Sequence, residues 1–295
     1  MRNPLHTLLD AIDAKPLGDD RFQVRCVEHR RPRVFGGELL AQAVAVAART
    51  VQDRACHAMH VNFLSPGDPK TPIEYSVRRV RDGRRFAQRQ VSGYQRGREI
   101  VLATVSFTTD SADAAGFQRE PMPDVPGPEG LASELDQRLA VADRFAPEHR
   151  PWLTTPRAVE VRQVRPVPLF DPPPVPPIAH TWIKAVAAIP DDQALHCAVL
   201  AYASDATLLD IAFYPHGVSW ISPKAQQASL NHGMWFHRPF RIDEWLLYAQ
   251  HVPSSAGGRA IARGSVFTRD GALVASVVQE GLSQVAPGDS ALGGR

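Results

Sequence analysis

The sequence predicts an α+β protein made of two diverged copies of one unit, each a helix with an antiparallel sheet. Three observations support this fold class. The chain has 295 residues, more than the ~100–150 of a typical domain. An internal repeat relates its two parts, and turn signals separate strand-like segments in both. We expect a first unit at residues 1–110, a connector at 111–157 and a second unit at 158–295.

The repeat shows as a constant offset of 173 residues (236 − 63) between similar segments. Phe63–Leu64–Ser65–Pro66 matches Phe236–His237–Arg238–Pro239. The same offset relates further apolar positions, namely Tyr75 with Tyr248, Tyr94 with Phe267, Ile100 with Leu273 and Val101 with Val274. Because the offset persists without a gap, the strands and turns in these stretches should have equal lengths in the two copies.

The first copy is expected to be a helix followed by four strands. After Gly36 and Gly37, the segment Glu38–Val51 places apolar side chains at helical spacing. Dipeptides typical of hairpin turns lie between the later strands, at Asp82–Gly83 and Arg96–Gly97. The strands are expected at Ala58–Phe63, Ile73–Val80, Arg85–Gly93 and Glu99–Thr108.

The second copy opens with the strand-like segments Val159–Val164 and Thr181–Ala187, and helical spacing follows from Asp192 onward. Its later strands are expected at Ser229–Phe236, Trp245–Val252, Arg259–Thr268 and Ala272–Glu280, with Asp270–Gly271 as a turn. Antiparallel sheets of this kind have one face free to cover a helix.

A proline-rich segment, residues 171–177, cannot be a central strand because proline has no backbone N–H to donate. We expect a stiff surface connection between the halves rather than a ligand for a proline-recognition domain. Residues 111–128 are similarly typical of a loop.

Composition limits the function classes. Apolar residues make up 44% and charged residues 22%, as in folded rather than disordered proteins. A net charge of +2 lacks the basic excess of a protein that binds nucleic acid. Cys26, Cys56 and Cys197 are too widely spaced to predict a disulfide framework or a thiolate metal site, which favours a reducing compartment, the cytoplasm.

The chain is expected to have no membrane span. Met1–Lys15 lacks the uninterrupted apolar core of a secretion signal, and no apolar run reaches the ~20 residues of a membrane span. Open sheet edges are usually covered by a partner, so we expect a homo-oligomer, at least a dimer.

The candidate chemistry follows from two exclusions. No Gly-x-Ser-x-Gly nucleophile elbow is present. The histidine pairs His57 with His60 and His232 with His237 lack a third ligand, and on strands one member of each pair would face the wrong side, so no metal is expected. A third route needs a carboxylate, a hydroxyl and an amide that hold a water against an activated carbonyl, with backbone N–H groups for the oxyanion. The second half offers such groups in Tyr202–Asp205, Ala228–His232 and Val278–Gly281.

Five motifs together resemble the acyl-CoA thioesterase II family, in the order of that family and from about Leu17 to Gln284. They are Val34–Phe35–Gly36–Gly37, Phe63–Leu64–Ser65–Pro66–Gly67–Asp68, Tyr202–Ala203–Ser204–Asp205, His232–Gly233–Met234–Trp235–Phe236–His237–Arg238–Pro239 and Val278–Gln279–Glu280–Gly281. The resemblance implies a double hotdog fold, with each antiparallel sheet wrapped round a long helix. It also implies hydrolysis of fatty acyl-CoA to the acid and coenzyme A, without a cofactor.

The family uses an Asp, a Thr or Ser, and a Gln to orient the attacking water. Matched by motif, these roles fall on Asp205, Ser229 and Gln279. Substrate-binding candidates of lower rank are Gly36 and Gly37, whose N–H groups open a helix, and His232 and Trp235; the two glycines equally fit a close backbone approach, and His232 equally fits a packed aromatic wall.

Two features separate this chain from the family pattern. Ser229 stands where the family commonly has Thr, which keeps the hydroxyl. Glu38 stands where the family usually has Gln, and it is expected to add a negative charge that suits the helix dipole and to alter the acyl pocket or an oligomer contact.

Two alternative functions stay open. A non-catalytic acyl-CoA-binding protein is the first, although a binder has no use for a water-activating set. A hotdog hydratase or dehydratase is the second, although Gly67–Pro72 departs from its Gly-Asp-x-Asn-Pro-x-His pattern at the Asn and the His.

Overall fold

The computed structural model describes residues 3–27, 33–109 and 115–286. The first half of the chain contains two helices and six strands. In chain order these are α1 (Pro4–Ile12), β1 (Lys15–Gly18), β2 (Arg21–Val24), α2 (Gly36–Ala48), β3 (Ala55–Phe63), β4 (Ile73–Asp82), β5 (Phe86–Gln95) and β6 (Arg98–Thr108).

The second half repeats this order after three short connecting helices. It contains α3 (Glu134–Ala140), the 3₁₀ helix η1 (Ala142–Arg144), α4 (Arg150–Leu153), β7 (Val159–Gln163), β8 (Ile178–Ala185), α5 (Gln193–Ser204), η2 (Asp210–His216), β9 (Ala225–Phe236), β10 (Leu246–Ala256), β11 (Arg259–Thr268) and β12 (Leu273–Val285).

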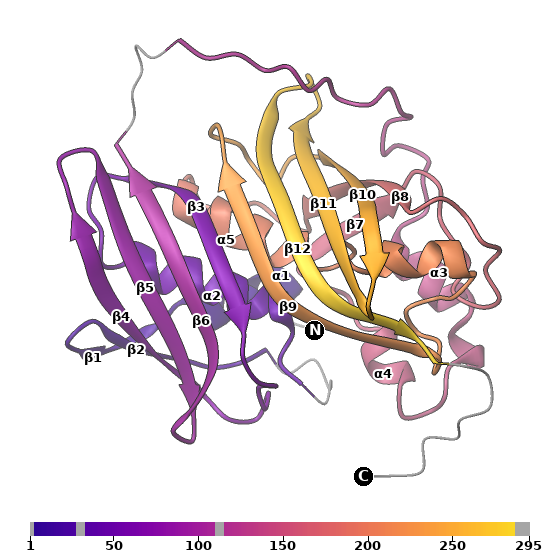
Figure 1. Ribbon diagram of the computed structural model, residues 1–295, viewed down its shortest axis with the longest axis horizontal. Helices are drawn as coiled ribbons and strands as arrows, with labels where there is room; N and C mark the ends of the chain where they lie inside the picture. Colours follow the sequence, from indigo (N-terminus) through magenta and orange to yellow (C-terminus); the bar gives the residue numbers. More distant parts are fainter. Residues whose placement is uncertain (1–2, 28–32, 110–114, 287–295) are drawn as a thin grey trace.

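All described strand pairings are antiparallel, and they join into one sheet in the order β1-β2-β4-β5-β6-β3-β9-β12-β11-β10-β8-β7 (Figure 1). The order reads the same from both ends once β3 is matched with β9, β6 with β12, β5 with β11 and β4 with β10. The two halves meet where β3 pairs with β9, from Ala58 opposite Trp235 to Asn62 opposite Asn231. This arrangement is the predicted double hotdog, with the two sheets fused edge to edge.

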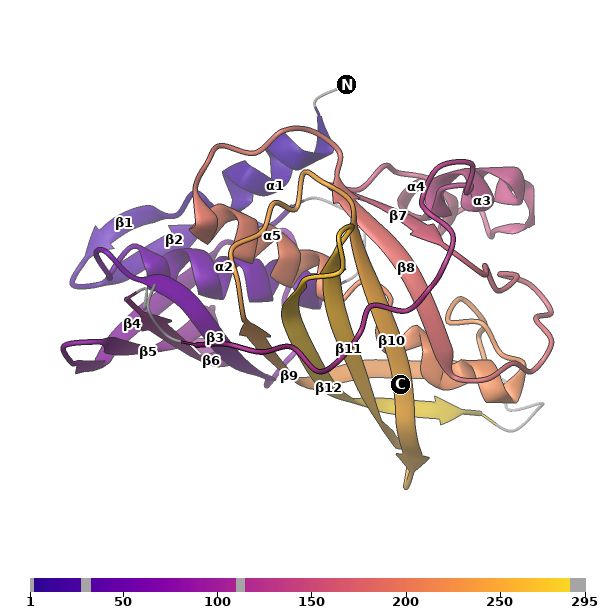
Figure 2. The same ribbon diagram turned by 90° about the horizontal axis from the view of Figure 1, so that it is seen from above.

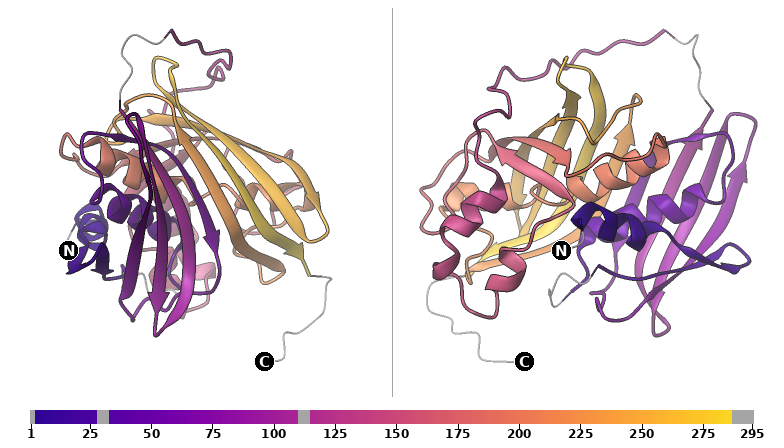
Figure 3. Two further views of the ribbon diagram at one scale, coloured as in Figure 1. Left: turned by 60° about the vertical axis from the view of Figure 1, so that its left-hand side comes forward. Right: turned by 180° about the vertical axis from the view of Figure 1, so that it is seen from behind.

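Helices α2 and α5 lie side by side on the concave face of the sheet and pack against each other (Figures 2 and 3). Both are buried along nearly their whole length. Their many alanines allow a close approach of the two backbones, and the aliphatic side chains between them fill the core. Helix α1 packs on α2, and its Leu5, Leu8, Ala11 and Ile12 are buried there.

The segment that follows β6 crosses to the second half and shields the outer face of its sheet. Met122, Val125 and Leu131 pack against a small apolar cluster formed by Trp182, Leu247 and Phe267. The Trp182 indole N–H donates to the carbonyl of Pro126 at 2.8 Å. These contacts cover apolar side chains that face away from the helices.

The predicted helices and strands are confirmed, with ends displaced by a few residues. The offset of 173 relates the two ends of β5 to those of β11 without error, since 86 and 95 become 259 and 268. The expectation of equal turn lengths was wrong for the hairpin that follows: Phe63 lies opposite Val101 but Phe236 lies opposite Ala275, so the offset along β6 and β12 is 174. The predicted loop at residues 111–128 has no helix or strand in its described part, 115–128. The unit boundaries stay predictions, because the sheet is continuous across the two halves.

The placement of the proline-rich segment was wrong. Residues 171–177 connect β7 to β8, so they join two strands inside the second half rather than the two halves. The connection between the halves is the long stretch from β6 to β7. Among the described residues, no helix combines the length and the apolar character needed to cross a membrane.

Candidate active site

Three elements of the second half place the predicted catalytic residues together. Asp205 is the C-cap of α5, Ser229 lies near the start of β9, and Gln279 lies in β12, which pairs with β9. The Gln279 amide Nε2 lies 2.8 Å from Oδ1 of Asp205 and 2.8 Å from Oγ of Ser229. The Ser229 hydroxyl donates to the same Oδ1 at 3.3 Å. The carboxylate, hydroxyl and amide therefore form a closed triangle.

A β-bulge brings Ser229 to the inner face of the sheet. Along β9 the buried side chains are His232, Met234 and Phe236, so simple alternation would turn Ser229 outward. The pairing with β12 shifts between Glu280 and Gly281, and Gly281 stands opposite Ser229, so Leu230 is the extra residue. An inserted residue reverses the facing of everything before it. The bulge thus explains why Ser229 and Gln279 meet.

The N-terminus of α2 faces this triangle from the first half. A Cβ atom added to Gly36 would lie 2.6 Å from Oδ2 of Asp205, and one added to Gly37 would lie 2.4 Å from the carbonyl oxygen of Tyr202. The close backbone approach that the glycines suggested is therefore present. The first N–H groups of a helix have no partner within the helix, and its dipole favours negative charge there.

A cavity of about 700 Å³ opens beside Asp205 and Ser229. Its walls are mainly apolar and come from the start of α2, the connector, the β7–β8 connection and the chain from η2 to the start of β9. The larger apolar residues are Val34, Phe35, Phe145, Leu153, Phe170, Trp220 and Ile221. Phe145 packs on Phe170 with ring centres 5.5 Å apart. The guanidinium groups of Arg33, Arg144 and Arg157 also border the cavity. Sequence reasoning missed the contribution of the connector, because it depends on tertiary packing.

The buried neighbours of the triangle are uncharged. Gln279 is fully buried and is not among the lining residues, so it contacts Asp205 and Ser229 from below. His232 is also buried, and burial lowers its pKa to about 4. The imidazole is therefore neutral at neutral pH, and it lies too deep to touch a molecule in the cavity.

Two further carboxyl groups have raised pKa values. Asp210, which lines the cavity and accepts a hydrogen bond from Gln227 at 3.1 Å, has a pKa raised to about 7, chiefly by burial. Burial raises the pKa of Glu38 to about 8. Glu38 is fully inside the core, where it accepts from the Val27 N–H at 2.7 Å and from Gln42 at 3.2 Å. The raised pKa favours a neutral carboxyl group at pH 7 rather than the negative charge expected at the helix start.

The structure does not bring Trp235 to the site. Its ring packs edge-on against His60, with centres 5.1 Å apart, where β9 pairs with β3. This is the sheet face opposite the helices, because the neighbouring Met234 and Phe236 face the core. Among the described residues, no group of three His, Cys, Asp or Glu side chains is placed to hold a metal ion.

The corresponding end of α2 in the first half is built differently. Its C-cap is Arg49, where α5 has Asp205. By strand pairing, Cys56 and Val105 stand where Ser229 and Gln279 stand, since Met59, the counterpart of His232, lies opposite Val105. Of the two related helix ends, only that of α5 carries the carboxylate, hydroxyl and amide.

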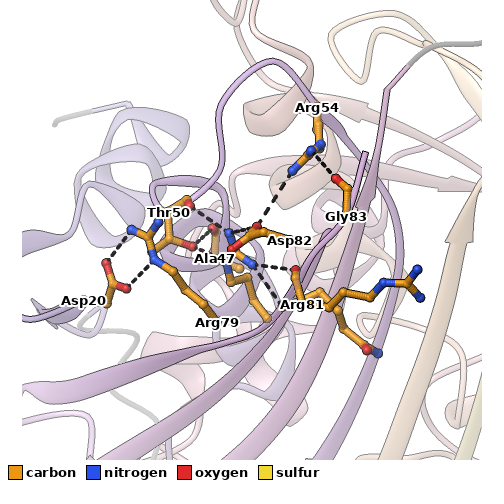
Figure 4. Close-up of polar contacts among 10 residues, drawn as sticks. Asp20, Ala47, Thr50, Arg54, Arg79, Arg81, Asp82 and Gly83 are labelled. Atoms are coloured by element: carbon orange, nitrogen blue, oxygen red, sulfur yellow. Dashed lines mark hydrogen bonds and ion pairs between the residues drawn. The ribbon is translucent and has the colours of Figure 1, made fainter. Parts of the chain in front are cut away.

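A buried arginine closes this end of α2. All five N–H groups of Arg89 have acceptors: the hydroxyl and carbonyl of Thr50, the carbonyls of Arg81 and Gln88, and the carboxylate of Asp82 at 2.7 Å. Figure 4 shows Asp82 also approached by Arg54, with the Asp20–Arg79 ion pair beside them. The polar groups here satisfy one another, so this end of the helix is structural.

Comparison with known proteins gives one consistent result. Residues 162–282 match the family model described as acyl-CoA thioesterase, and residues 28–108 match that of the acyl-CoA thioesterase N-terminal domain. The chain is 34% identical to human acyl-coenzyme A thioesterase 8, over 94% of this chain and 88% of that protein. It is 31% identical to acyl-CoA thioesterase 2 of Haemophilus influenzae, over 96% and 98%.

Solved structures agree with these matches. The acyl-CoA thioesterase II TesB2 of Mycobacterium marinum superimposes with a TM-score of 0.76 at 35% identity, over 95% of this chain and 99% of that one. The tesB protein of Mycobacterium avium subsp. paratuberculosis gives a TM-score of 0.79 at 29% identity, over the same shares.

Proposed function

Because this chain belongs to the acyl-CoA thioesterase family, we propose that it hydrolyses acyl-CoA by direct attack of water at the triangle of Asp205, Ser229 and Gln279. The observation that carries this proposal is the convergence of a carboxylate, a hydroxyl and an amide, all within 3.3 Å of one another, beside an apolar cavity. The activity is thioester hydrolysis, which yields a free acid and coenzyme A.

In the proposed reaction, Asp205 is the general base. A water on the cavity side of Asp205 and Ser229 attacks the thioester carbonyl carbon and gives its proton to the carboxylate. Ser229 orients the water, since a hydroxyl that donates to Asp205 and accepts from Gln279 keeps a lone pair for one more hydrogen bond. Gln279 acts through both residues by holding them in place.

The tetrahedral intermediate then collapses. Its oxyanion is stabilised by the first N–H groups of α2, at Gly36 and Gly37, since this helix begins beside Asp205. The C–S bond breaks, and the coenzyme A thiolate takes the proton that Asp205 received from water. Base and acid roles thus fall on one carboxylate, and no covalent intermediate forms.

The cavity supports an acyl-CoA substrate. Its apolar wall, with Phe145, Phe170 and Ile221, suits an acyl chain, and Arg33 and Arg144 at its border suit the phosphates of coenzyme A. The connector helices η1 and α4 supply part of this wall, so we propose that they contribute to the choice of acyl chain.

The test is thiol release from short-, medium- and long-chain acyl-CoAs by the wild type and by Asp205→Asn. Asparagine keeps an oxygen that can accept from Gln279 but cannot take the proton, so we expect a loss of at least about 10²-fold in kcat with folding intact. Asp124→Asn, which changes an exposed carboxylate in the connector, is the matched control. Equal rates for Asp205→Asn and wild type would refute the site, and tight acyl-CoA binding without turnover by the wild type would make the protein a binder.

We propose three further attributes of the functional protein. The edge strands β1 and β7 favour a homo-oligomer, and sedimentation showing only monomer would contradict this. The free thiols of Cys26, Cys56 and Cys197 favour the cytoplasm. We further propose units at 1–110 and 158–295 joined by a connector at 111–157.

A further inference from the structure

We propose that His232 is a positioning residue for the hydrolysis: its imidazole fixes the Gln279 amide in the one orientation that directs both amide N–H groups at Asp205 and Ser229. This inference rests on the proposed function and deepens it, since it concerns how the triangle is held. His232 itself touches neither the cavity nor the reacting atoms.

A line of three buried side chains, Ser204, His232 and Gln279, runs behind the cavity. Oγ of Ser204 lies 3.0 Å from Nε2 of His232, and Nδ1 of His232 lies 3.2 Å from Oε1 of Gln279. The other end of the Gln279 amide contacts Asp205 and Ser229. His232 and Gln279 are directly opposite each other across β9 and β12, so their side chains share one face of the sheet. Ser204 precedes Asp205 at the end of α5, which therefore supplies one end of the line and the carboxylate beyond the other.

The hydrogen-bond chemistry allows one arrangement. The two acceptors, Asp205 Oδ1 and Ser229 Oγ, require the NH₂ group of Gln279 to face them. Its oxygen must then face His232, and Nδ1 of His232 must carry the proton that it donates. A neutral imidazole has one donor and one acceptor, so Nε2 accepts from the Ser204 hydroxyl.

The Ser204 hydroxyl can serve either tautomer, so the choice of tautomer falls to Gln279. This hydroxyl lies 2.9 Å from the carbonyl of Ala201 as well as 3.0 Å from His232 Nε2, and its single proton serves one acceptor at a time. When this proton points at Nε2, the imidazole proton stays on Nδ1. In the other tautomer a bare Nδ1 would face Oε1 of Gln279, the amide would turn over, and its oxygen would oppose the Asp205 carboxylate.

The experiment compares two variants. His232→Leu removes the hydrogen-bond donor. His232→Asn keeps a donor, because its amide nitrogen is attached to Cγ, as Nδ1 is in histidine. We expect His232→Leu to lower kcat by about 10- to 100-fold with little change in KM, the size of effect seen when an outer partner that orients a functional group is removed. His232→Asn should restore most of kcat. Asp205→Asn and Gln279→Ala are measured in parallel, with thermal unfolding of every variant.

The outcomes separate the two proposals. Wild-type kcat in Asp205→Asn and Gln279→Ala refutes the proposed site itself. Loss of activity in those variants with wild-type kcat in His232→Leu overturns the role of His232 and leaves the site standing. Equal losses in His232→Leu and His232→Asn, both folded, show that the donated hydrogen bond is not the reason, which also overturns it.

A second measurement determines the tautomer of His232 in the wild-type protein itself. Protein labelled with ¹⁵N at histidine gives long-range ¹H–¹⁵N correlations that show which ring nitrogen carries the proton. The signals of His232 are assigned as the set that is lost in His232→Asn or perturbed in Ser204→Ala. We expect a neutral His232 with the proton on Nδ1 at pH 7. A proton on Nε2, or on both nitrogens, would contradict the inference even if His232→Leu does not fold.

Discussion

Replacing Glu38 with Gln should make the protein more stable, and increasingly so as the pH rises from about 5 to 8. In the folded protein Glu38 is fully buried, and its Oε2 has no hydrogen-bond partner among the described residues. Burial raises its pKa from 4.5 to about 8. Between these pH values the folded state keeps a proton that the unfolded state has released, so the free energy of unfolding falls as the pH rises.

The magnitude follows from the size of this window. One pKa unit corresponds to about 1.4 kcal/mol, so the wild type should lose about 1.4 kcal/mol per pH unit through this one group, or nearly 3 kcal/mol between pH 5.5 and 7.5. Glu38→Gln keeps the oxygen that accepts from Val27 and Gln42 and removes the proton linkage. Below about pH 4.5 the two proteins should differ little.

The assay is urea unfolding of both proteins at half-unit steps of pH. Glu74→Gln, at an exposed position of β4, is the control, and its stability should run parallel to that of the wild type. Parallel curves for wild type and Glu38→Gln between pH 5.5 and 7.5 would refute the reasoning, because they would mean that Glu38 is ionised in the folded protein.

Three further predictions concern the site and its counterpart. Gly36→Ala puts a methyl group against the Asp205 carboxylate, so kcat for thiol release should fall at least about 10-fold. The melting temperature should stay near that of the wild type, because the Asp205 side chain can move away. An unchanged kcat would show that Gly36 is not part of the site. Arg89→Met should lower the free energy of unfolding in urea by about 3 kcal/mol and leave kcat unchanged. This is the lower end for a broken buried ion pair, because the Asp82 side chain is half exposed and regains water. A loss of less than about 1 kcal/mol would contradict this. Asp210 has a pKa near 7, so above that pH it becomes charged inside the cavity. The kcat/KM of the wild type should therefore fall above pH 7 relative to that of Asp210→Asn. Identical pH profiles would show that Asp210 does not influence the substrate.

Most of the fold follows from local sequence signals. The strand-like run that ends before the Asp270–Gly271 turn predicts β11 to the residue, because a short turn fixes where the strand ends. Helix α1 was missed although its signals are present: Asn3 accepts from the Leu5 N–H at 2.9 Å as the N-cap, and Pro4 follows. The capping box of Ser133 and Asp136 at α3 was missed in the same way.

The candidate site could be predicted only in part. The motifs named Asp205, Ser229 and Gln279, but their meeting depends on the bulge at Leu230, which no pattern of apolar residues reveals. The place of His232 behind Gln279 depends on strand register, and the cavity wall of Phe145 and Phe170 depends on how the connector packs. Contacts that are distant in sequence are set by tertiary structure, and local propensity does not encode them.

The arginine-closed end of α2 separates the tasks of the two halves. In a pair of identical subunits, every substitution at a helix end would appear twice, once at each site. In the proposed reaction the first half contributes the start of α2, while the second half contributes Asp205 and its partners. A substitution around Arg89 is therefore expected to change the stability of the protein without changing catalysis. A substitution around Asp205 is expected to change catalysis with little effect on the first half. The fused chain can adjust these two properties independently, a freedom that a symmetric dimer of single units lacks.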